Sequence, residues 1–389
     1  RTQPLPGGTL LGVPTSAARL DGLLPPDALA AVAAEPGRPL RWEPGGDVAV
    51  GGLLRERFGD DLVDRLADPL LGGVYAGRVD ALGLRTTNPA LAAALDAGAP
   101  SLTAAADRAT GAVPADGPAG PPTDRPGAPP RGPVFGAVRG GYTRLLDALV
   151  AAAGAQIRLR TTVRAVEQRA EGGWRLVLGP TTAPEALDVD AVVLAVPAPA
   201  VARLLGPIAP AQAAAAAGIE LASSAVVALA YRPPDAATLP PTSGVLIATG
   251  EPLAVKGVTH SSRKWSHLSP DGLVRLRASL GRFGEAATLQ VEDAELVARV
   301  RADLAVLAGI TAAPVAVHVQ RWGGGLPQYG VGHADRVRAV EDGLPDGLAV
   351  AGAALHGVGV PACIATARAA ADRVTTFLTT PLPAPLPAR

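Results

Sequence analysis

The sequence contains no methionine and only one cysteine, Cys363, among its 389 residues. A single cysteine cannot form an internal disulfide, and it excludes a zinc site built on several thiolates. The five histidines form no HExxH pair or other closely spaced metal-binding pattern. The sequence therefore indicates neither a disulfide scaffold nor a metal centre. Because the chain begins with Arg1 and not with Met, we expect that residues of the natural protein precede it.

The chain also lacks an excess of charge of either sign. Its 35 Lys and Arg residues balance 35 Asp and Glu residues, so the basic footprint of a nucleic-acid-binding protein is not expected. No apolar run reaches the length of a membrane span, and the N-terminus has no signal-peptide pattern. We therefore predict a cytoplasmic protein without a nucleic-acid partner or an integral membrane span. Peripheral association with a membrane is left open.

One stretch near the end of the chain, residues 346–374, has the features of a cofactor-binding segment. It begins with a short apolar run, Leu348–Ala351, which is typical of a strand buried on both faces. A loop of small residues, Gly352–Val360, follows, and Pro361 then occupies a position suited to the first turn of a helix. Such a helix would present free N–H groups and its positive dipole end. The stretch therefore predicts a site for an anionic or electron-rich group.

The residues alone leave two readings of this stretch open. The spacing Gly357, Gly359 and Ala362 fits the dinucleotide-binding fingerprint with alanine in place of the last glycine, which is a weak signal by itself. It also lies at the wrong end of the chain, and no βαβ unit with a ribose-binding acid follows. The alternative is an ordinary closing strand, glycine-rich turn and helix.

The first third of the chain is predicted to be helical over residues 25–104. Asp47 is a candidate N-cap for a helix that ends at Gly59. A second helix follows, and we expect it to end at Asp68–Pro69, because the residue before a proline is disfavoured in a helix.

The rest of the chain divides into three stretches of different character. Residues 108–133 are crowded with proline and glycine, which is typical of an exposed loop. After them we predict a helix, 142–153, and strands at 157–168, 174–178 and 191–196. Beyond these, an antiparallel sheet crossed by a helix, 291–308, is expected from strands at 223–231, 244–248, 254–260, 274–280 and 314–320. The strict alternation of the segment at 274–280, VRLRASL, predicts a strand with one buried face.

Five motifs in this order resemble those of one enzyme family. They are PLLGGVYAG at 69–77, SSRKW at 261–265, RW at 321–322, LPQYGVGH at 326–333 and AGAALHGVGVPACIATARAAA at 351–371. Together they resemble the protoporphyrinogen and coproporphyrinogen III oxidases of the amine-oxidase-like flavoprotein superfamily, and the resemblance runs over nearly the whole chain. It also implies that a first βαβ unit, whose glycine-rich turn holds the FAD pyrophosphate, precedes Arg1.

The fold implied by this resemblance combines α/β and α+β parts. An FAD-binding domain (Rossmann-like, GR2-type) is made of discontinuous segments, with an inserted antiparallel-sheet substrate domain and a helical subdomain. The expected boundaries are 1–132 for the helical substrate-cavity subdomain, 133–207 and 345–377 for the two FAD-binding segments, 208–344 for the substrate domain, and 378–389 for a tail.

The resemblance also implies site residues. A catalytic side chain is not required, because the flavin carries the chemistry. For the cofactor, the implied residues are Val163, whose backbone would meet the adenine, Trp322 against the flavin, and Gly352, Val358, Gly359, Val360 and Cys363. For the substrate they are Arg19, as a propionate partner, Tyr75, Gly77 and Lys264, with Arg38, Arg41, Arg55 and Arg57 as reserves. Taken without the resemblance, Val163 reads as part of a simple hairpin, Gly77 as part of a turn, and Arg19 and Lys264 as surface groups.

The implied activity is the FAD-dependent oxidation of coproporphyrinogen III in three two-electron steps, with molecular oxygen as acceptor and hydrogen peroxide as product. A ferrochelatase-type enzyme is the expected downstream partner. Three alternatives remain open: a protoporphyrinogen oxidase, an amine oxidase of the same superfamily, and a flavin-less scaffold protein. Residues 330–376 contain no Phe, Trp or Tyr to cage an amine, which favours a wide, flat substrate.

Overall fold

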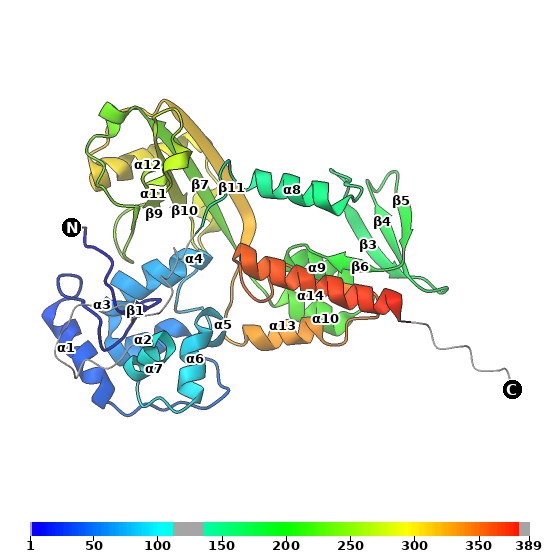
Figure 1. Cartoon of the computed structure of the whole chain (residues 1–389), viewed down its shortest axis with the longest axis horizontal. Coiled ribbons are helices and arrows are strands. Elements are labelled where there is room, and N and C mark those ends of the chain that lie inside the picture. Colours follow the sequence, from blue (N-terminus) through cyan, green and yellow to red (C-terminus); the bar gives the residue numbers. More distant parts are fainter. Residues whose placement is uncertain (1, 112–135, 381–389) are drawn as a thin grey trace, which may run out of the picture. The chain divides into compact units, whose positions relative to one another are not determined.

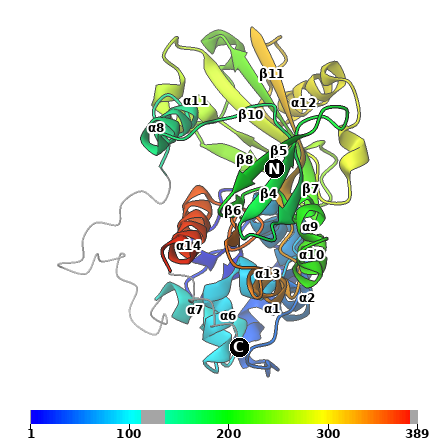
Figure 2. The ribbon, with the colours of Figure 1, turned by 90° about the vertical axis from the view of Figure 1, so that its right-hand side faces the viewer.

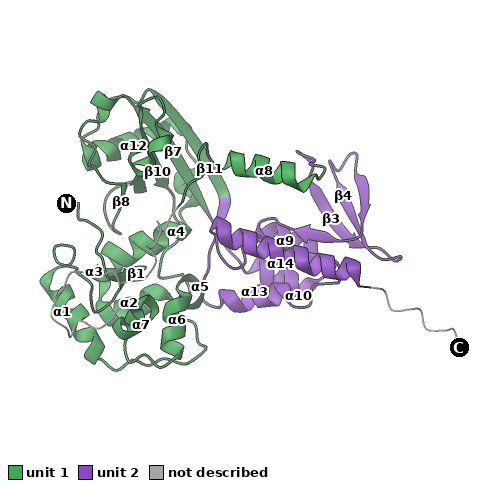
Figure 3. Cartoon of the chain, viewed as in Figure 1, with its two compact units in different colours: residues 1–156, 223–323 green, residues 157–222, 324–389 purple. Residues whose placement is uncertain are grey.

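The computed structural model describes residues 2–111 and 136–380. The chain forms two compact units, each of which is built from two segments (Figure 3). Unit 1 comprises residues 1–156 and 223–323, and unit 2 comprises residues 157–222 and 324–389. Most of the predicted loop at 108–133 lies outside the described residues. Its first three residues belong to a helix, so the prediction starts too early.

The N-terminal part of unit 1 is a cluster of short helices (Figure 1). A buried ion pair joins them: Arg57 and Glu35 lie 2.8 Å apart and are almost fully buried. The Glu35 carboxylate also accepts the N–H groups of Leu102 and Thr103. It therefore links three segments of the chain that are distant in sequence. The elements are β1 (Thr9–Leu10), β2 (Val13–Pro14), α1 (Pro26–Ala34), η1 (Glu35–Gly37), α2 (Val50–Phe58), α3 (Asp60–Leu62), η2 (Val63–Gly72), α4 (Gly73–Tyr75), α5 (Leu84–Thr87), α6 (Pro89–Asp96) and α7 (Leu102–Thr110).

Two local predictions for this region are wrong. Asp47 does not cap α2, whose N-cap is Ala49; the Asp47 carboxylate accepts the N–H of Arg85 instead. The helix expected to stop at Asp68–Pro69 continues as η2, a π-helix with Pro69 inside it. Tertiary contacts of the Asp68 side chain, described below, stabilise this π-helix, although a proline inside a helix is locally unfavourable.

The second part of unit 1 is a five-stranded sheet in the order β11-β7-β10-β9-β8. Its strands are β7 (Leu221–Tyr231), β8 (Gly244–Leu246), β9 (Val255–Thr259), β10 (Val274–Leu280) and β11 (Ala316–Pro327). Strand β10 pairs antiparallel with β7 and β9, and Leu276, Ala278 and Leu280 are buried while Arg277 is exposed. The predicted half-buried strand is therefore confirmed.

Helix α12 (Asp293–Ala308) covers the buried face of this sheet (Figure 2). Its Leu296, Val300 and Leu304 share one hydrophobic core with the sheet. The remaining elements of unit 1 are short, apart from α8: α8 (Thr143–Ala153), η3 (Pro233–Ala236), α11 (Ser261–Lys264), η4 (Ser266–Leu268) and η5 (Ala286–Leu289).

Unit 2 contains two small sheets with helices around them. Strands β3 (Val163–Gln168), β4 (Trp174–Leu178) and β5 (Glu185–Val189) form an antiparallel sheet, and β3 is shorter than the predicted strand at 157–168. Strand β6 (Val192–Leu194) pairs in parallel with β12 (Leu348–Val350), which joins the two sequence segments of the unit. The helices are α9 (Ala198–Leu205), α10 (Pro210–Ala217), α13 (His333–Glu341) and α14 (Val360–Thr379).

Candidate functional site

The strand, loop and helix predicted near the end of the chain are present in unit 2. Buried strand β12 ends at Val350, and α14 begins at Val360 with Pro361 in its first turn. The N–H of Gly352 donates to the Thr366 hydroxyl at 3.0 Å, which fastens the start of the loop to the helix. At its other end, the N–H of Cys363 donates to the Gly359 carbonyl at 3.0 Å. Loop 352–360 is therefore held at both ends by α14.

Two glycines of this loop have different roles. Gly357 has a φ of +151°, and a Cβ there would lie 2.7 Å from the Ala362 Cβ, so glycine is required by the loop's own packing. Gly359 has an ordinary φ of −72°, and a Cβ there would meet only Pro361, at 3.8 Å. The space beside Gly359 is thus open. A flat group could approach the backbone there, next to the N–H groups of Val360 and Ala362, which have no acceptor within the helix. This arrangement fits a flavin ring.

A stacked pair of side chains supports the loop from the preceding segment. The rings of Tyr329 and His333 lie 4.1 Å apart. The Tyr329 hydroxyl donates to the Ala353 carbonyl at 2.5 Å, and His333 Nε2 lies 3.0 Å from the Leu355 carbonyl. Burial lowers the pKa of His333 to about 4, so the ring is neutral at physiological pH and donates through Nε2. Its Nδ1 has no hydrogen-bond partner among the residues that the structure describes.

The sequence marks this pair only as part of a motif, LPQYGVGH, and assigns no role to Tyr329. The contacts of His333 are those of a neutral, hydrogen-bonding side chain. The signal that could have identified Tyr329 is its position four residues before His333, the first residue of α13, on whose ring it stacks.

The other cofactor candidates lie in different surroundings. Val163 begins β3 and packs against the core cluster that contains Leu355, and its carbonyl accepts from Arg203 Nη2 at 3.1 Å. Cys363 is half-buried, with its Sγ 3.8 Å from the Gly357 carbonyl. Val358 is partly exposed, and Trp322 lies on β11 with 53% of its surface exposed. All except Trp322 belong to unit 2.

The substrate candidates all lie in unit 1. Tyr75 and Gly77 are buried at the end of α4, where Ala76 has a left-handed backbone and Gly77 donates to the Gly72 carbonyl at 3.0 Å. Arg19 is exposed. Lys264 ends α11, with its ammonium 6.0 Å from the centre of the Trp265 ring. These four assignments remain predictions.

Three of the four arginines named above as reserve substrate partners form ion pairs or hydrogen bonds with other residues of the chain. Arg57 is wrong as a rim residue, because it is buried against Glu35. Arg55 forms ion pairs with three aspartates, and Arg38 donates to the carbonyls of Glu56 and Arg57. Across residues 2–111 and 136–380, no group of three or more His, Cys, Asp and Glu residues is arranged to hold a metal ion. Within the same residues, no helix is both long and apolar enough to span a membrane.

A model of the flavin containing amine oxidoreductases matches residues 45–375 of the chain. This chain belongs to that family. Membership confirms the flavin cofactor expected from the sequence, FAD, and the recognition of the superfamily.

Two named relatives show which enzymes of this family the chain is similar to. The chain is 46% identical over 369 residues to the coproporphyrinogen III oxidase of Mycobacterium leprae (strain TN), which covers 94% of the chain and 76% of that relative. It is 36% identical to the coproporphyrinogen III oxidase of Propionibacterium freudenreichii subsp. freudenreichii, over 85% of the chain and 65% of that protein.

Solved structures agree on the fold. A crystal structure from Exiguobacterium sp. 255-15, provisionally assigned as a protoporphyrinogen oxidase, superposes with a TM-score of 0.77 at 30% identity, over 96% of this chain and 78% of that one. Cyclohexylamine oxidase from Brevibacterium oxydans IH-35A gives a TM-score of 0.62 at 14% identity, over 95% and 78%, which shows the fold alone. The predicted mixture of helices and sheets is confirmed, and the predicted domain boundaries stay a prediction.

Proposed function

We propose that this chain functions as an FAD-dependent oxidase that converts coproporphyrinogen III to coproporphyrin III, with molecular oxygen as acceptor and hydrogen peroxide as product. The observation that carries the proposal is the 46% identity, over 94% of the chain, to a protein named coproporphyrinogen III oxidase. The product would serve a metal-inserting enzyme of the ferrochelatase type in haem biosynthesis. A cytoplasmic location is part of the same proposal.

Loop 352–360 and the start of α14 are proposed to hold the flavin. A bound flavin would supply the redox chemistry by accepting two electrons in each step. The chain's own part is to leave room for the ring beside Gly359 and to donate N–H groups from the first turn of α14 to an electron-rich edge. This surface is completed by Gly352, Val358, Val360 and Cys363. The side chains of Tyr329 and His333 hold two carbonyls of the loop in place. Val163 and Trp322 are proposed as further cofactor contacts.

The parallel pairing of β6 with β12 supports the proposal that two distant segments share one FAD-binding domain. We place these segments at 133–207 and 345–377, with the substrate domain at 208–344 between them. The helical subdomain, 1–132, is proposed to provide much of the substrate cavity.

The substrate is proposed to lie against the turn that contains Tyr75 and Gly77, with Arg19 and Lys264 near its carboxylates. Burial raises the pKa of Tyr75, so its phenol stays protonated and is uncharged beside an apolar ring. An exposed arginine such as Arg19 can form a bidentate pair with a propionate.

The test is oxidation of both porphyrinogens by the flavin-loaded protein, purified with whatever residues its gene encodes before Arg1. We expect a higher kcat/KM for coproporphyrinogen III, measured by porphyrin fluorescence, together with stoichiometric hydrogen peroxide. A higher kcat/KM for protoporphyrinogen would overturn the substrate choice, and oxidation of amines alone would overturn the reaction class.

Arg19→Ala is expected to raise KM about tenfold, equivalent to about 1.4 kcal/mol, with kcat little changed, because it removes one charge-assisted contact at a partly solvated rim. The exposed Arg338 on α13 gives a matched control, since Arg338→Ala removes the same charge. An unchanged KM in the Arg19 variant would remove that residue from the site.

A further inference from the structure

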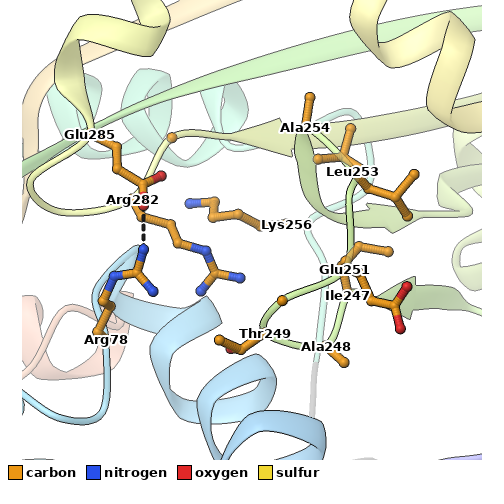
Figure 4. Close-up of a pocket in the computed structure, with 13 residues that line it drawn as sticks. Arg78, Ile247, Ala248, Thr249, Glu251, Leu253, Ala254, Lys256, Arg282 and Glu285 are labelled. Atoms are coloured by element: carbon orange, nitrogen blue, oxygen red, sulfur yellow. Dashed lines mark hydrogen bonds and ion pairs between the residues drawn. The ribbon is translucent and has the colours of Figure 1, made fainter.

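A polar cavity of about 200 Å³ lies within unit 1, beside the turn proposed for the substrate. Its walls come from the loop that joins β8 and β9, from the start of β9, from the loop after β10, and from Arg78, which directly follows Gly77 (Figure 4). A backbone hydrogen bond of 2.6 Å from the Phe283 N–H to the Ala76 carbonyl ties the loop after β10 to this turn. The volume is several times the roughly 30 Å³ share of one water molecule, so a small side chain of a ligand fits.

A buried and fully engaged carboxylate, Asp68, binds two of the residues that line the cavity, Thr249 and Arg282. Asp68 accepts the Val79 N–H at 3.0 Å and the Thr249 hydroxyl at 2.5 Å, and it pairs with Arg282 at 3.2 Å. Only 3% of the Asp68 side chain and 13% of the Arg282 side chain are exposed. The Asp68 carboxylate therefore compensates the charge of Arg282 in a fixed geometry.

Lys256 is the cation of the cavity that lacks such a partner. It is 8% exposed, and no hydrogen bond or ion pair of its ammonium occurs within the described residues. Figure 4 shows the ammonium pointing towards Arg282 and Glu285, and Glu285 is itself paired with Arg78. The Glu251 carboxylate points away from the three cations in the same view. Two of the three cations are therefore paired with carboxylates, and the Lys256 ammonium is the one that has no direct ion pair among the described residues.

A largely buried ammonium that no hydrogen bond or ion pair neutralises is unfavourable, and a ligand can supply the missing partner. A single carboxylate matches the one unpaired ammonium and can accept from both Lys256 and Arg282. A phosphate dianion matches less well, because the carboxylates of Asp68 and Glu285 flank the two cations.

We propose that Lys256, with Arg282, forms a binding site for one carboxylate side chain of the porphyrinogen, whose ring lies against the neighbouring Tyr75–Gly77 turn. This inference deepens the proposed function and rests on it for the identity of the ligand. Lys256 is a specificity residue in this view, since a substrate with fewer carboxylates would leave the ammonium unpaired.

The pH dependence of binding follows from the charges around the ammonium. Burial, and then the neighbouring Arg282, lower the pKa of Lys256 to about 8, while Glu285 acts in the opposite direction. A bound carboxylate favours the charged form and raises this pKa. The affinity for the ligand should therefore fall as the pH rises above 8. The charged groups that face the ammonium are Arg78, Arg282 and Glu285; Glu251 also lines the cavity, with its carboxylate turned away, and Asp68 pairs with Arg282.

The decisive experiment measures binding of coproporphyrin III and of its uncharged tetramethyl ester by fluorescence, without turnover, so that it does not depend on the oxidase activity. We expect Lys256→Met to weaken binding of the acid about tenfold and to leave the ester unchanged, and Lys256→Arg to restore affinity for the acid. Arg338→Met is the matched control. An equal loss for acid and ester would reduce Lys256 to a structural role and overturn the proposal.

Two further measurements keep the proposal testable if Lys256→Met fails to fold. The dissociation constant of the wild-type protein for the acid should rise above pH 8, and that of Lys256→Arg should not; parallel profiles would contradict the assignment. Lysine-selective ¹³C labelling reports on the two lysines of this sequence, Lys256 and Lys264. Coproporphyrin III should raise the pKa of the more buried one. A rise produced equally by inorganic phosphate would indicate a general anion site and would overturn the assignment to the substrate.

If coproporphyrin III binds as described but no porphyrinogen is oxidised, the proposed reaction fails while the carboxylate site stands. If the porphyrinogen is oxidised and Lys256 has no influence on binding of the acid, the reaction stands and the carboxylate site fails.

Discussion

The two regions that carry these proposals offer a ligand opposite things. The cavity in unit 1 offers side-chain charge: Lys256 and Arg282 stand in a polar space where Asp68 and Glu285 are already paired. Loop 352–360 in unit 2 offers backbone groups and the absence of side chains, with glycine where a ring would approach. Under the two proposals, one chain recognises a charged periphery by titratable groups and a flat ring by shape. Size should therefore decide function in the loop, and charge should decide it in the cavity.

The largest effect is expected from a change of size in the loop. Gly359→Val places a branched side chain in the open space beside the backbone, where only Pro361 is near. We expect the flavin dissociation constant to rise about 5- to 150-fold, because overpacking costs about 1–3 kcal/mol. The melting temperature of the flavin-free protein should stay within the range of ordinary surface variants. Flavin absorbance after gel filtration and a thermal melt measure the two quantities.

Gly357→Val sharpens this prediction by contrast. Its Cβ would lie 2.7 Å from the Ala362 Cβ at a φ of +151°, so the flavin-free protein itself should lose stability. If Gly359→Val retained its flavin, or if both variants destabilised the flavin-free protein equally, the loop would not be a surface kept open for a ring.

The sequence is informative about the loop because the rules that shape it are local. A buried apolar run, a series of small residues and Pro361 at a helix start are sufficient to predict β12, the loop and α14, and all three are present. The alternation of residues 274–280 is local information of the same kind. The position of glycine 357 opposite Ala362 could not be predicted, because it depends on how the loop closes onto the helix.

The cavity could not be predicted, because the contacts that make it are distant in sequence. Local rules end a helix at Asp68–Pro69, yet η2 continues through both residues. The side chain of Asp68 binds Thr249 and Arg282, which are 181 and 214 residues away. The failure of a local rule therefore coincides with the carboxylate that pairs with Arg282 of the proposed site. Arg57 fails for a related reason, since its partner Glu35 is not evident from the spacing.

A change of charge in the cavity should affect stability in the direction opposite to binding. The folded protein holds Lys256 with a pKa of about 8, against an ordinary value of 10.5, because burial disfavours the charged form. Below pH 8 both folded and unfolded chains are protonated, so the full penalty is present. Lys256→Met removes it, and we expect the free energy of unfolding at pH 7 to rise by up to about 3 kcal/mol, at 1.36 kcal/mol per pKa unit.

The gain should shrink as the pH rises from about 8 towards 10.5, because the folded wild-type protein then loses the proton while the unfolded chain retains it. Urea titrations at several pH values measure this difference. Lys264→Met is the control, because the lysine at 264 is exposed and its removal should change stability by less than about 0.5 kcal/mol. A clear loss of stability in Lys256→Met at pH 7 would show that the ammonium has a structural partner, and the contrast between the two regions would weaken.

The smallest effect is expected from removing one side-chain hydrogen bond that supports loop 352–360. Tyr329→Phe removes the hydroxyl that donates to the Ala353 carbonyl at 2.5 Å and keeps the stacked ring against His333. A net loss of about 1 kcal/mol in the free energy of unfolding is expected, with a rise of a few-fold in the flavin dissociation constant, since a buried carbonyl loses its partner. Tyr231→Phe is a matched control in unit 1: its hydroxyl is buried without a hydrogen-bond partner among the described residues, so its removal should be neutral or slightly stabilising. Denaturant titration and flavin fluorescence measure both quantities. Equal effects of the two substitutions would mean that the hydroxyl of Tyr329 does not position the loop, and that its shape is set by the backbone and α14 alone.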